Sequence, residues 1–205
     1  MGLLFIGSSL AFAQAKSGVE NYNLLSSDQA YSWMPILHYQ SDGGFYSELR
    51  YNYEDIKTVS IYGGKKFSAG KQGMVEFIPM LGVSAGTFTG VSMACNTEGE
   101  WDHFFISVQT QYSMSTKKER SDFFFNWSEV AIKLSQNVFA GAAAQITLQR
   151  DLKDFQPGFM AGFSLGKISI PLYMFNPFQP DRWLLMGINY EYLIKKRMNK
   201  SKNLP

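Results

Sequence analysis

Apolar and polar positions alternate with a period of two residues along most of the chain, from Trp33 to Leu193. The clearest stretch covers residues 104–114, where Ile106 falls on one face and Gln109 on the other. Successive side chains of a β-strand point to opposite faces of a sheet, so this period is typical of strands. Helical spacing hardly occurs. The pattern therefore predicts an all-β protein.

About ten segments carry this pattern, and many are close to the 9 to 11 residues that a tilted membrane-spanning strand requires. They are residues 46–54, 57–67, 74–84, 90–96, 104–114, 123–134, 138–149, 158–165, 168–175 and 183–193. The turn at residues 41–44 admits a further hairpin with residues 33–40. An even strand number then needs a partner from residues 19–32, which gives twelve strands instead of ten. Pro35 argues against this hairpin, because proline is confined to sheet edges, strand starts and bulges.

Composition decides which way the apolar face points. Charged residues make up 18% of the chain and aromatic residues 16%, whereas a soluble domain has about 25% charged residues. No apolar run reaches the roughly 18 to 20 residues of a spanning helix. We therefore expect a single closed antiparallel transmembrane β-barrel of about 10 strands, with 12 as the alternative.

In such a barrel the apolar face contacts lipid and the polar face lines the lumen. The predicted lumen-facing polar network is Glu48, Arg50, Glu76, Gln109, Gln111, Glu129, Lys133, Gln145, Gln149 and Glu191. The predicted lipid-facing residues are Leu49, Tyr51, Ile106, Val108, Val130, Ile132, Ile146, Met186 and Ile188. Trp101, Trp127, Trp183, Tyr112, Tyr190 and Tyr192 are candidates for an interfacial aromatic girdle.

The ends of the chain differ from the barrel. Residues 2–13 are apolar and end in Ala11-Phe12-Ala13, which predicts a secretory signal peptide at residues 1–13. The positively charged region that normally begins a signal peptide is missing, and a true start upstream of Met1 would explain this. We expect an N-terminal segment at 14–31, the barrel at 32–194 and a basic tail at 195–205. The tail is interpreted as a solvated terminus, because the body has no basic stripe interleaved with aromatics for nucleic acid.

The predicted connections alternate in length. Short turns at residues 135–137 and 166–167 interleave with longer polar segments. Membrane barrels have short periplasmic turns and longer extracellular loops. We therefore expect the extracellular loops at residues 53–57, 87–90, 115–122, 150–157 and 176–182, with the C-terminus in the periplasm.

Several stretches resemble the small uncharacterised outer-membrane barrel proteins common in Bacteroidetes. They are YSELRYNYED at 46–55, PMLG at 79–82, WSE at 127–129 and YMFNP at 173–177. The resemblance implies an exported barrel of the Gram-negative outer membrane, surrounded by outer-membrane lipid and lipopolysaccharide and inserted by the outer-membrane assembly machinery. It carries no catalytic residues. Tyr190, Tyr192 and Leu193 resemble the usual terminal signal of such barrels, but here a basic extension follows.

Charges inside a narrow barrel must pair or stay hydrated. The lumen-facing set therefore predicts either a structural plug of salt bridges or a hydrated conduit for small solutes. Catalysis has little support: only His38 and His103 are present, and we interpret both as interfacial or loop residues. Asp102 and His103 are adjacent, so we expect them on opposite faces of a strand. In that geometry Asp102 cannot easily form the hydrogen bond that would orient a catalytic histidine. Residues 63–66 (GGKK) lack phosphate-loop spacing and favour a glycine bend or bulge.

The function that these patterns favour is a monomeric outer-membrane barrel, acting as a narrow passive channel for small solutes or in a structural or surface-interaction role. No ligand spacing indicates a metal, and we expect no cofactor and no nucleic-acid partner. Two alternatives stay open. One is an outer-membrane barrel enzyme acting on lipid or peptide. The other is a soluble periplasmic lipocalin-like barrel that binds an apolar ligand, with the two strand faces exchanged.

Overall fold

The computed structural model describes residues 15–26, 31–70 and 75–194, and their regular structure is entirely β. The strands are β1 Lys16–Ser26, β2 Ser32–Gln40, β3 Phe45–Tyr51, β4 Thr58–Lys65, β5 Phe67–Ala69, β6 Val75–Gly86, β7 Gly90–Trp101, β8 Phe104–Ser115, β9 Phe123–Lys133, β10 Val138–Gln149, β11 Leu152–Leu165, β12 Ile168–Phe175 and β13 Trp183–Leu193. Within the described part of the chain, no helix has the length and apolar character needed to cross a membrane.

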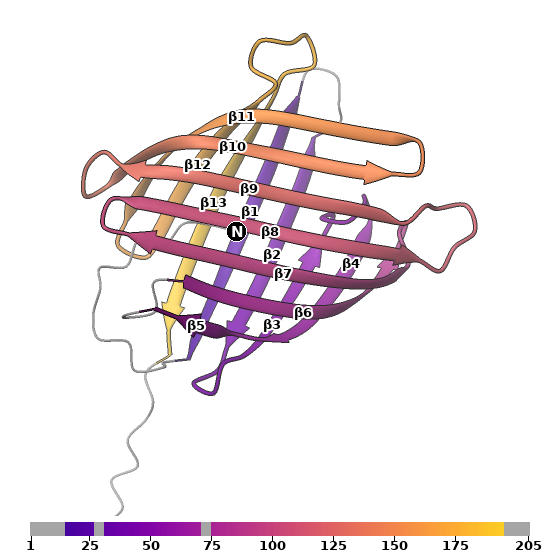
Figure 1. Ribbon diagram of the computed structural model, residues 1–205, viewed down its shortest axis with the longest axis horizontal. Helices are drawn as coiled ribbons and strands as arrows, with labels where there is room; N and C mark the ends of the chain where they lie inside the picture. Colours follow the sequence, from indigo (N-terminus) through magenta and orange to yellow (C-terminus); the bar gives the residue numbers. More distant parts are fainter. Residues whose placement is uncertain (1–14, 27–30, 71–74, 195–205) are drawn as a thin grey trace, which may run out of the picture.

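All these strands belong to one antiparallel sheet that closes on itself. Each strand pairs with its neighbours in the sequence, and β1 closes the ring by pairing with β13 along its whole length, from Lys16 opposite Leu193 to Ser26 opposite Trp183. β4 and β5 both pair with β6, so they occupy one position in the wall, interrupted at Lys66. The result is a twelve-strand barrel, in which the strands of the front wall run across those of the back wall (Figure 1).

The all-β closed barrel expected from the sequence is confirmed, and the strand number is the twelve of the alternative. The two extra strands are β1, from the segment set apart at residues 14–31, and β2, which holds Pro35. The barrel wall therefore begins at Lys16 instead of residue 32. The objection from Pro35 was wrong, because the β1–β2 ladder continues past it, with Pro35 opposite Asn21.

The two ends of the barrel differ in their connections. The end where β1 begins and β13 finishes, here called the terminal end, has tight turns such as Asp102-His103 and Gly166-Lys167. The opposite end, the loop end, has longer segments at residues 52–57, 116–122 and 176–182. The long loop expected at 150–157 is absent there. Gln149 pairs directly with Leu152, so only Arg150 and Asp151 turn the chain.

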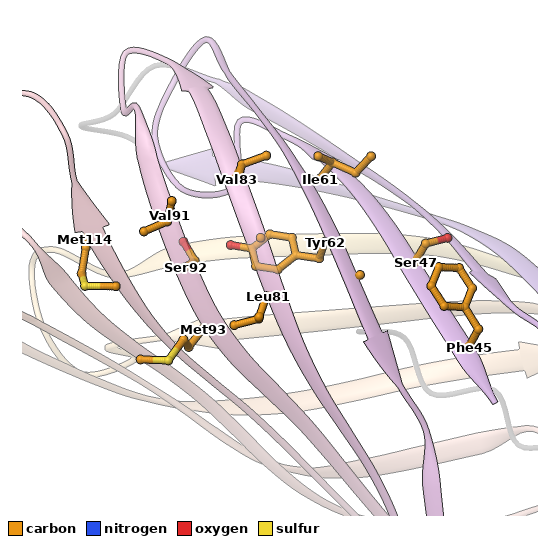
Figure 2. A pocket seen from close by; sticks show the side chains of 12 residues that line it. Phe45, Ser47, Ile61, Tyr62, Leu81, Val83, Val91, Ser92, Met93 and Met114 are labelled. Atoms are coloured by element: carbon orange, nitrogen blue, oxygen red, sulfur yellow. The ribbon is translucent and has the colours of Figure 1, made fainter.

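Large apolar side chains cover the outside of the wall, with Leu81 the most exposed of those within the strands, at 68%. On this surface Ile61, Leu81 and Met93 border a hollow of about 630 Å³ (Figure 2). Its floor includes Gly63, which leaves open space where a side chain would stand. The bend or bulge expected at residues 63–66 is not formed at the two glycines, and the pairing with β6 keeps the same register on both sides of Lys66. Gly64 pairs regularly, and a Cβ there would lie 2.3 Å from the carbonyl oxygen of Pro79.

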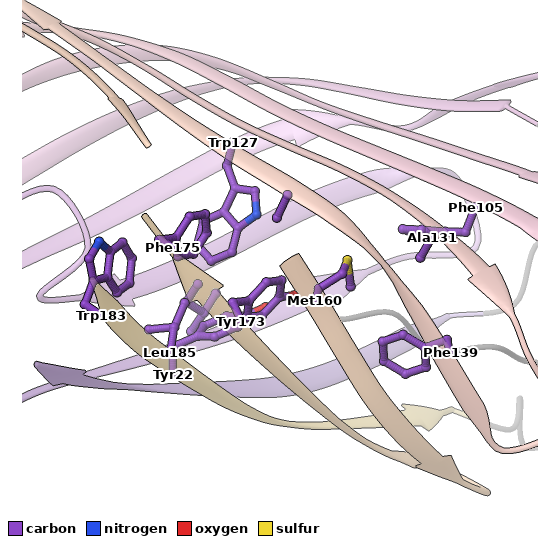
Figure 3. Packing of buried hydrophobic residues seen from close by; sticks show 12 residues of the cluster. Tyr22, Phe105, Trp127, Ala131, Phe139, Met160, Tyr173, Phe175, Trp183 and Leu185 are labelled. Carbon is purple, nitrogen blue, oxygen red and sulfur yellow. The ribbon is translucent and has the colours of Figure 1, made fainter. Parts of the chain in front are cut away.

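Many of the inward side chains are aromatic and pack in the lumen (Figure 3). Trp127 lies 5.3 Å from the Tyr173 ring and 5.9 Å from the Phe175 ring, and Trp183 stacks on Phe175 at 4.4 Å. Trp127 and Trp183 therefore do not belong to an interfacial girdle. Strand alternation turns both inward, where each is less than a tenth exposed. The other four girdle candidates, Trp101, Tyr112, Tyr190 and Tyr192, stand on the outer surface.

Candidate functional site: the lumen

The structure places the predicted polar residues on the inner face. Glu48, Arg50, Gln109, Gln111 and Glu129 are buried, Glu76, Lys133, Gln145 and Glu191 are half-buried, and Gln149 is exposed at the loop end. The predicted lipid-facing residues lie on the outer face: Leu49, Ile106, Val130, Ile132 and Ile188 are exposed, while Tyr51, Val108, Ile146 and Met186 are half-buried. The wall therefore has its apolar face outside and its polar face inside, which is the reverse of a lipocalin-like barrel.

Arg50 is the centre of the polar network. Its side chain is fully buried, and its Nε donates to Glu48 Oε1 at 2.7 Å. Its Nη1 donates to Gln111 Oε1 at 2.8 Å and lies 3.5 Å from Glu54 Oε1. The guanidinium also lies 4.2 Å from the centre of the Tyr62 ring, close enough for a cation–π contact. Since three wall positions separate β3 from β8, the bond to Gln111 crosses part of the lumen.

Two residues of the segment between β3 and β4 complete this network. The Tyr53 hydroxyl donates to Gln109, and its ring meets Phe125 edge-on at 5.9 Å. Glu54 accepts hydrogen bonds from the Tyr62 hydroxyl, at 2.8 Å, and from Ser60. Burial raises the pKa of Tyr53, so its phenol stays protonated and remains a donor.

The sequence did not indicate these roles. The strand pattern of residues 46–54 put Glu54 on the polar face, but residues 53–57 were also expected in an extracellular loop, and no periodic pattern shows that a loop folds back into a barrel. The Glu54 carboxylate four residues after Arg50 was the available signal.

An aromatic contact crosses the lumen directly. Tyr22 on β1 lies 5.8 Å from Trp127 on β9, ring centre to ring centre. Along the wall, four strands separate β1 from β9 on one side and six wall positions on the other, so the two strands lie on nearly opposite sides of the barrel. The contact therefore spans the lumen. The sequence pattern did not assign Tyr22 to the lumen, because alternation is weak in residues 19–32.

Among the described residues, three lysine salt bridges lie toward the terminal end, while Arg120 Nη1 lies 3.2 Å from Asp55 Oδ2 at the loop end. Lys16 Nζ lies 3.4 Å from Glu191 Oε1, Lys66 Nζ lies 2.5 Å from Glu76 Oε1, and Lys133 pairs with Glu100. Lys133 was expected to help close the lumen together with Arg50. Its partner Glu100 is instead near the end of β7, so this pair belongs to the rim of the barrel.

The two histidines occupy different environments. His38, expected in a loop or at the interface, faces the lumen from β2, and its Nδ1 lies 3.3 Å from Glu20 Oε1. His103 lies in an exposed turn, where its Nε2 is 3.5 Å from Asp102 Oδ2. The turn brings these neighbours together, contrary to the strand geometry expected. No hydrogen bond among the described residues joins either histidine to a Ser, Thr or Cys side chain.

Metal-binding geometry is also lacking in the described part of the chain: no group of three or more His, Cys, Asp or Glu side chains is arranged to hold an ion. Cys95, the single cysteine of the sequence, is half-buried on the outer face of β7.

Comparison with known proteins identifies the fold. No model of a protein family matches the chain, and no curated protein matches its sequence. Among solved structures, the chain is similar to the KdgM porin, alone and "in complex with disordered oligogalacturonate", each with a TM-score of 0.63 and 5% identity over 87% of this chain and 99% of the other. It is also similar to the NanC porin, with a TM-score of 0.62 and 8% identity over 87% of this chain and all of the other. The chain therefore has the fold of outer-membrane porins.

Proposed function

We propose that this protein is a narrow passive channel of the bacterial outer membrane, held closed at rest by contacts across its lumen. The single observation that carries the proposal is the fully buried Arg50, which bonds to Glu48 on its own strand and to Gln111 across the lumen. Porins of the same fold support a channel. We further infer that the chain is exported by its signal peptide, spans the membrane as a monomer and belongs with the small barrels common in Bacteroidetes.

The closing contacts form two groups. Arg50 with Gln111, and Tyr53 with Gln109, join β3 and the segment that follows it to β8. Tyr22 with Trp127 joins β1 to β9. Salt bridges alone would leave hydrated gaps, whereas aromatic rings fill space and exclude water. Together the two groups favour small or infrequent conductance over a permanent pore.

The charge of the lumen argues against taking over the oligogalacturonate of the KdgM complex as a ligand. Galacturonate units carry carboxylates, and such a chain needs cationic side chains along its path. In the described residues the inward carboxylates outnumber the inward cations. The carboxylates are Glu20, Glu48, Glu54, Glu76, Glu98, Glu100, Glu129, Asp154 and Glu191; the cations are Lys16, Arg50, Lys66 and Lys133, with His38 as an inward imidazole. A neutral or cationic solute suits this lumen better.

Planar-bilayer recording of the refolded protein tests the proposal. We expect no large stable pore from the unmodified chain, and several-fold more ion flux from Arg50→Ala, because Glu48 and Glu54 lose their cation and draw in water. Arg182→Ala is the matched control, since Arg182 is exposed at the loop end. Removing one partner of a buried ion pair costs about 3 to 5 kcal/mol, so Gln111→Ala provides a milder variant in case Arg50→Ala does not fold. Large, steady conductance from the unmodified protein would show that these contacts do not close the lumen.

A further inference from the structure

An acidic row crosses four neighbouring strands on the inner face of the barrel. Glu76 on β6 is directly opposite Glu98 on β7, which is opposite Ser107 on β8, which is opposite Glu129 on β9. Like charges directly opposite one another are unfavourable unless a cation lies nearby. Lys66 supplies one for Glu76. Among the described residues no Lys, Arg or His lies within ion-pair distance of Glu98 or Glu129, and Lys16 acts on Glu98 only from farther away.

Polar atoms without partners lie in and beside this row. Glu129 is 4% exposed; its Oε1 accepts a hydrogen bond from the Tyr173 hydroxyl at 2.9 Å, whereas its Oε2 has no partner of full hydrogen-bond geometry and the Trp127 indole lies near the carboxylate. Asn96 precedes Glu98 by two residues on the same face of β7, is 1% exposed, and has no partner for either atom of its amide group. Buried polar groups are nearly always satisfied, by protein, water or a ligand, so these atoms leave hydrogen-bonding capacity that a polar ligand can use.

We propose that Glu98 and Glu129 bind the ammonium groups of a small organic cation. An ammonium donates charge-assisted hydrogen bonds to carboxylates, and the Asn96 carbonyl oxygen is a further acceptor. The rings of Trp127 and Tyr173, beside Glu129, add aromatic surface that attracts alkylammonium cations. A multivalent metal ion would need a tighter group of ligands than the described residues offer.

The spacing of the two carboxylates suits a diamine. Glu98 and Glu129 stand on β7 and β9, with β8 between them, so their backbones are about 9 to 10 Å apart. Flexible side chains let a diamine with a five-carbon chain reach both. The closing contacts to Gln109 and Gln111 lie farther along β8 toward the loop end than Ser107 does. The site is therefore on the terminal-end side of the closure.

This inference rests on the proposed channel, since it names the class of solute that the lumen accepts, but its test needs no conduction. Isothermal titration of the full chain, folded in detergent micelles, measures binding of cadaverine. Pentanediol and glutarate have the same chain length with no charge and with negative charge. We expect saturable binding of cadaverine alone. Equal binding of pentanediol, or no binding of cadaverine, would overturn the inference while leaving the bilayer result for Arg50→Ala untouched.

Two substitutions locate the site. Glu98→Gln and Glu129→Gln keep the side-chain shape and remove the charge, and each is expected to weaken cadaverine binding about ten-fold or more. Glu119→Gln, in the exposed segment between β8 and β9, is the matched control and should bind like the unmodified chain. Heat-dependent gel mobility establishes whether each variant is folded. If Glu129→Gln does not fold, the affinity of Glu98→Gln alone tests the site. Unchanged affinity in folded Glu98→Gln would refute the site.

Discussion

At the scale of single residues, the environment changes completely between positions three residues apart. On β8, Ile106 is 37% exposed on the outer face, whereas Gln109 is 3% exposed in the lumen and accepts a hydrogen bond from Tyr53. In a membrane the outer environment is hydrocarbon, so the free-energy cost of placing the same charge at these two positions is very different. The chemistry of each position follows from its parity along the strand.

This difference can be measured with two arginine substitutions. Ile106→Arg should destabilise the barrel, because the guanidinium then faces hydrocarbon. Such a charge costs about 2 to 4 kcal/mol at the middle of the bilayer and less toward either end, and Ile106 is the third residue of β8. Gln109→Arg should cost much less, since the lumen holds carboxylates such as Glu48 that can pair with it. Folding titrations into lipid vesicles give both free energies. A larger penalty for Gln109→Arg would show that the faces are assigned the wrong way round.

Residue parity could be predicted from the sequence, but residue partners could not. Alternation alone places Arg50 and Gln111 inside. That they bond to each other depends on the width and stagger of the barrel, which strand patterns do not contain. In the same way Lys133 faces inward as expected, yet it forms a salt bridge with Glu100, which is near the rim and was not in the predicted network.

At the scale of elements, β1 decides whether the barrel closes. It pairs with β2 on one side and with β13 on the other. β2 and β13 both run toward the terminal end, so without β1 they could meet only as parallel neighbours in an otherwise antiparallel wall. Unpaired backbone groups facing lipid are very costly. The pattern of β1 is weak because Asn21 and Asn23 stand on its outer face, which explains why the sequence alone favoured ten strands.

Truncation tests this role. A chain that begins at residue 32 lacks β1 and should not form a barrel with heat-modifiable gel mobility, because two strand edges remain open. A chain that begins at residue 14 keeps β1 and is the control, with normal folding expected. Gel mobility before and after heating, together with circular dichroism, distinguishes the two. Normal folding of the shorter chain would mean that β1 is dispensable and that the eleven remaining strands of the wall suffice.

At the scale of the whole molecule, the barrel reverses the usual arrangement of a soluble protein. Exposed Leu, Ile, Val and Phe side chains surround the wall, while buried Glu, Arg, Gln and Asn side chains line its centre. Soluble monomers rarely expose contiguous apolar patches of more than a few hundred Å². Composition and alternation predicted this inversion from the sequence. The proposed closure of the lumen was only one of two alternatives there, because it depends on Tyr53 and Tyr22, which no pattern assigned to the lumen.

The location of the protein in the cell tests this arrangement of an apolar exterior around a polar interior. We expect recovery in the detergent-extracted outer membrane, retention through a carbonate wash that strips peripheral proteins, and faster gel mobility before heating than after it. Each follows from the apolar wall: the belt is stable only in lipid or detergent, and the continuous hydrogen-bonded ring resists unfolding until heated. The chain that begins at residue 32 supplies the contrast, since an open sheet should appear in aggregates. Recovery of the full chain in the soluble periplasm would contradict a membrane barrel, because no soluble protein of this size keeps such a belt exposed to water.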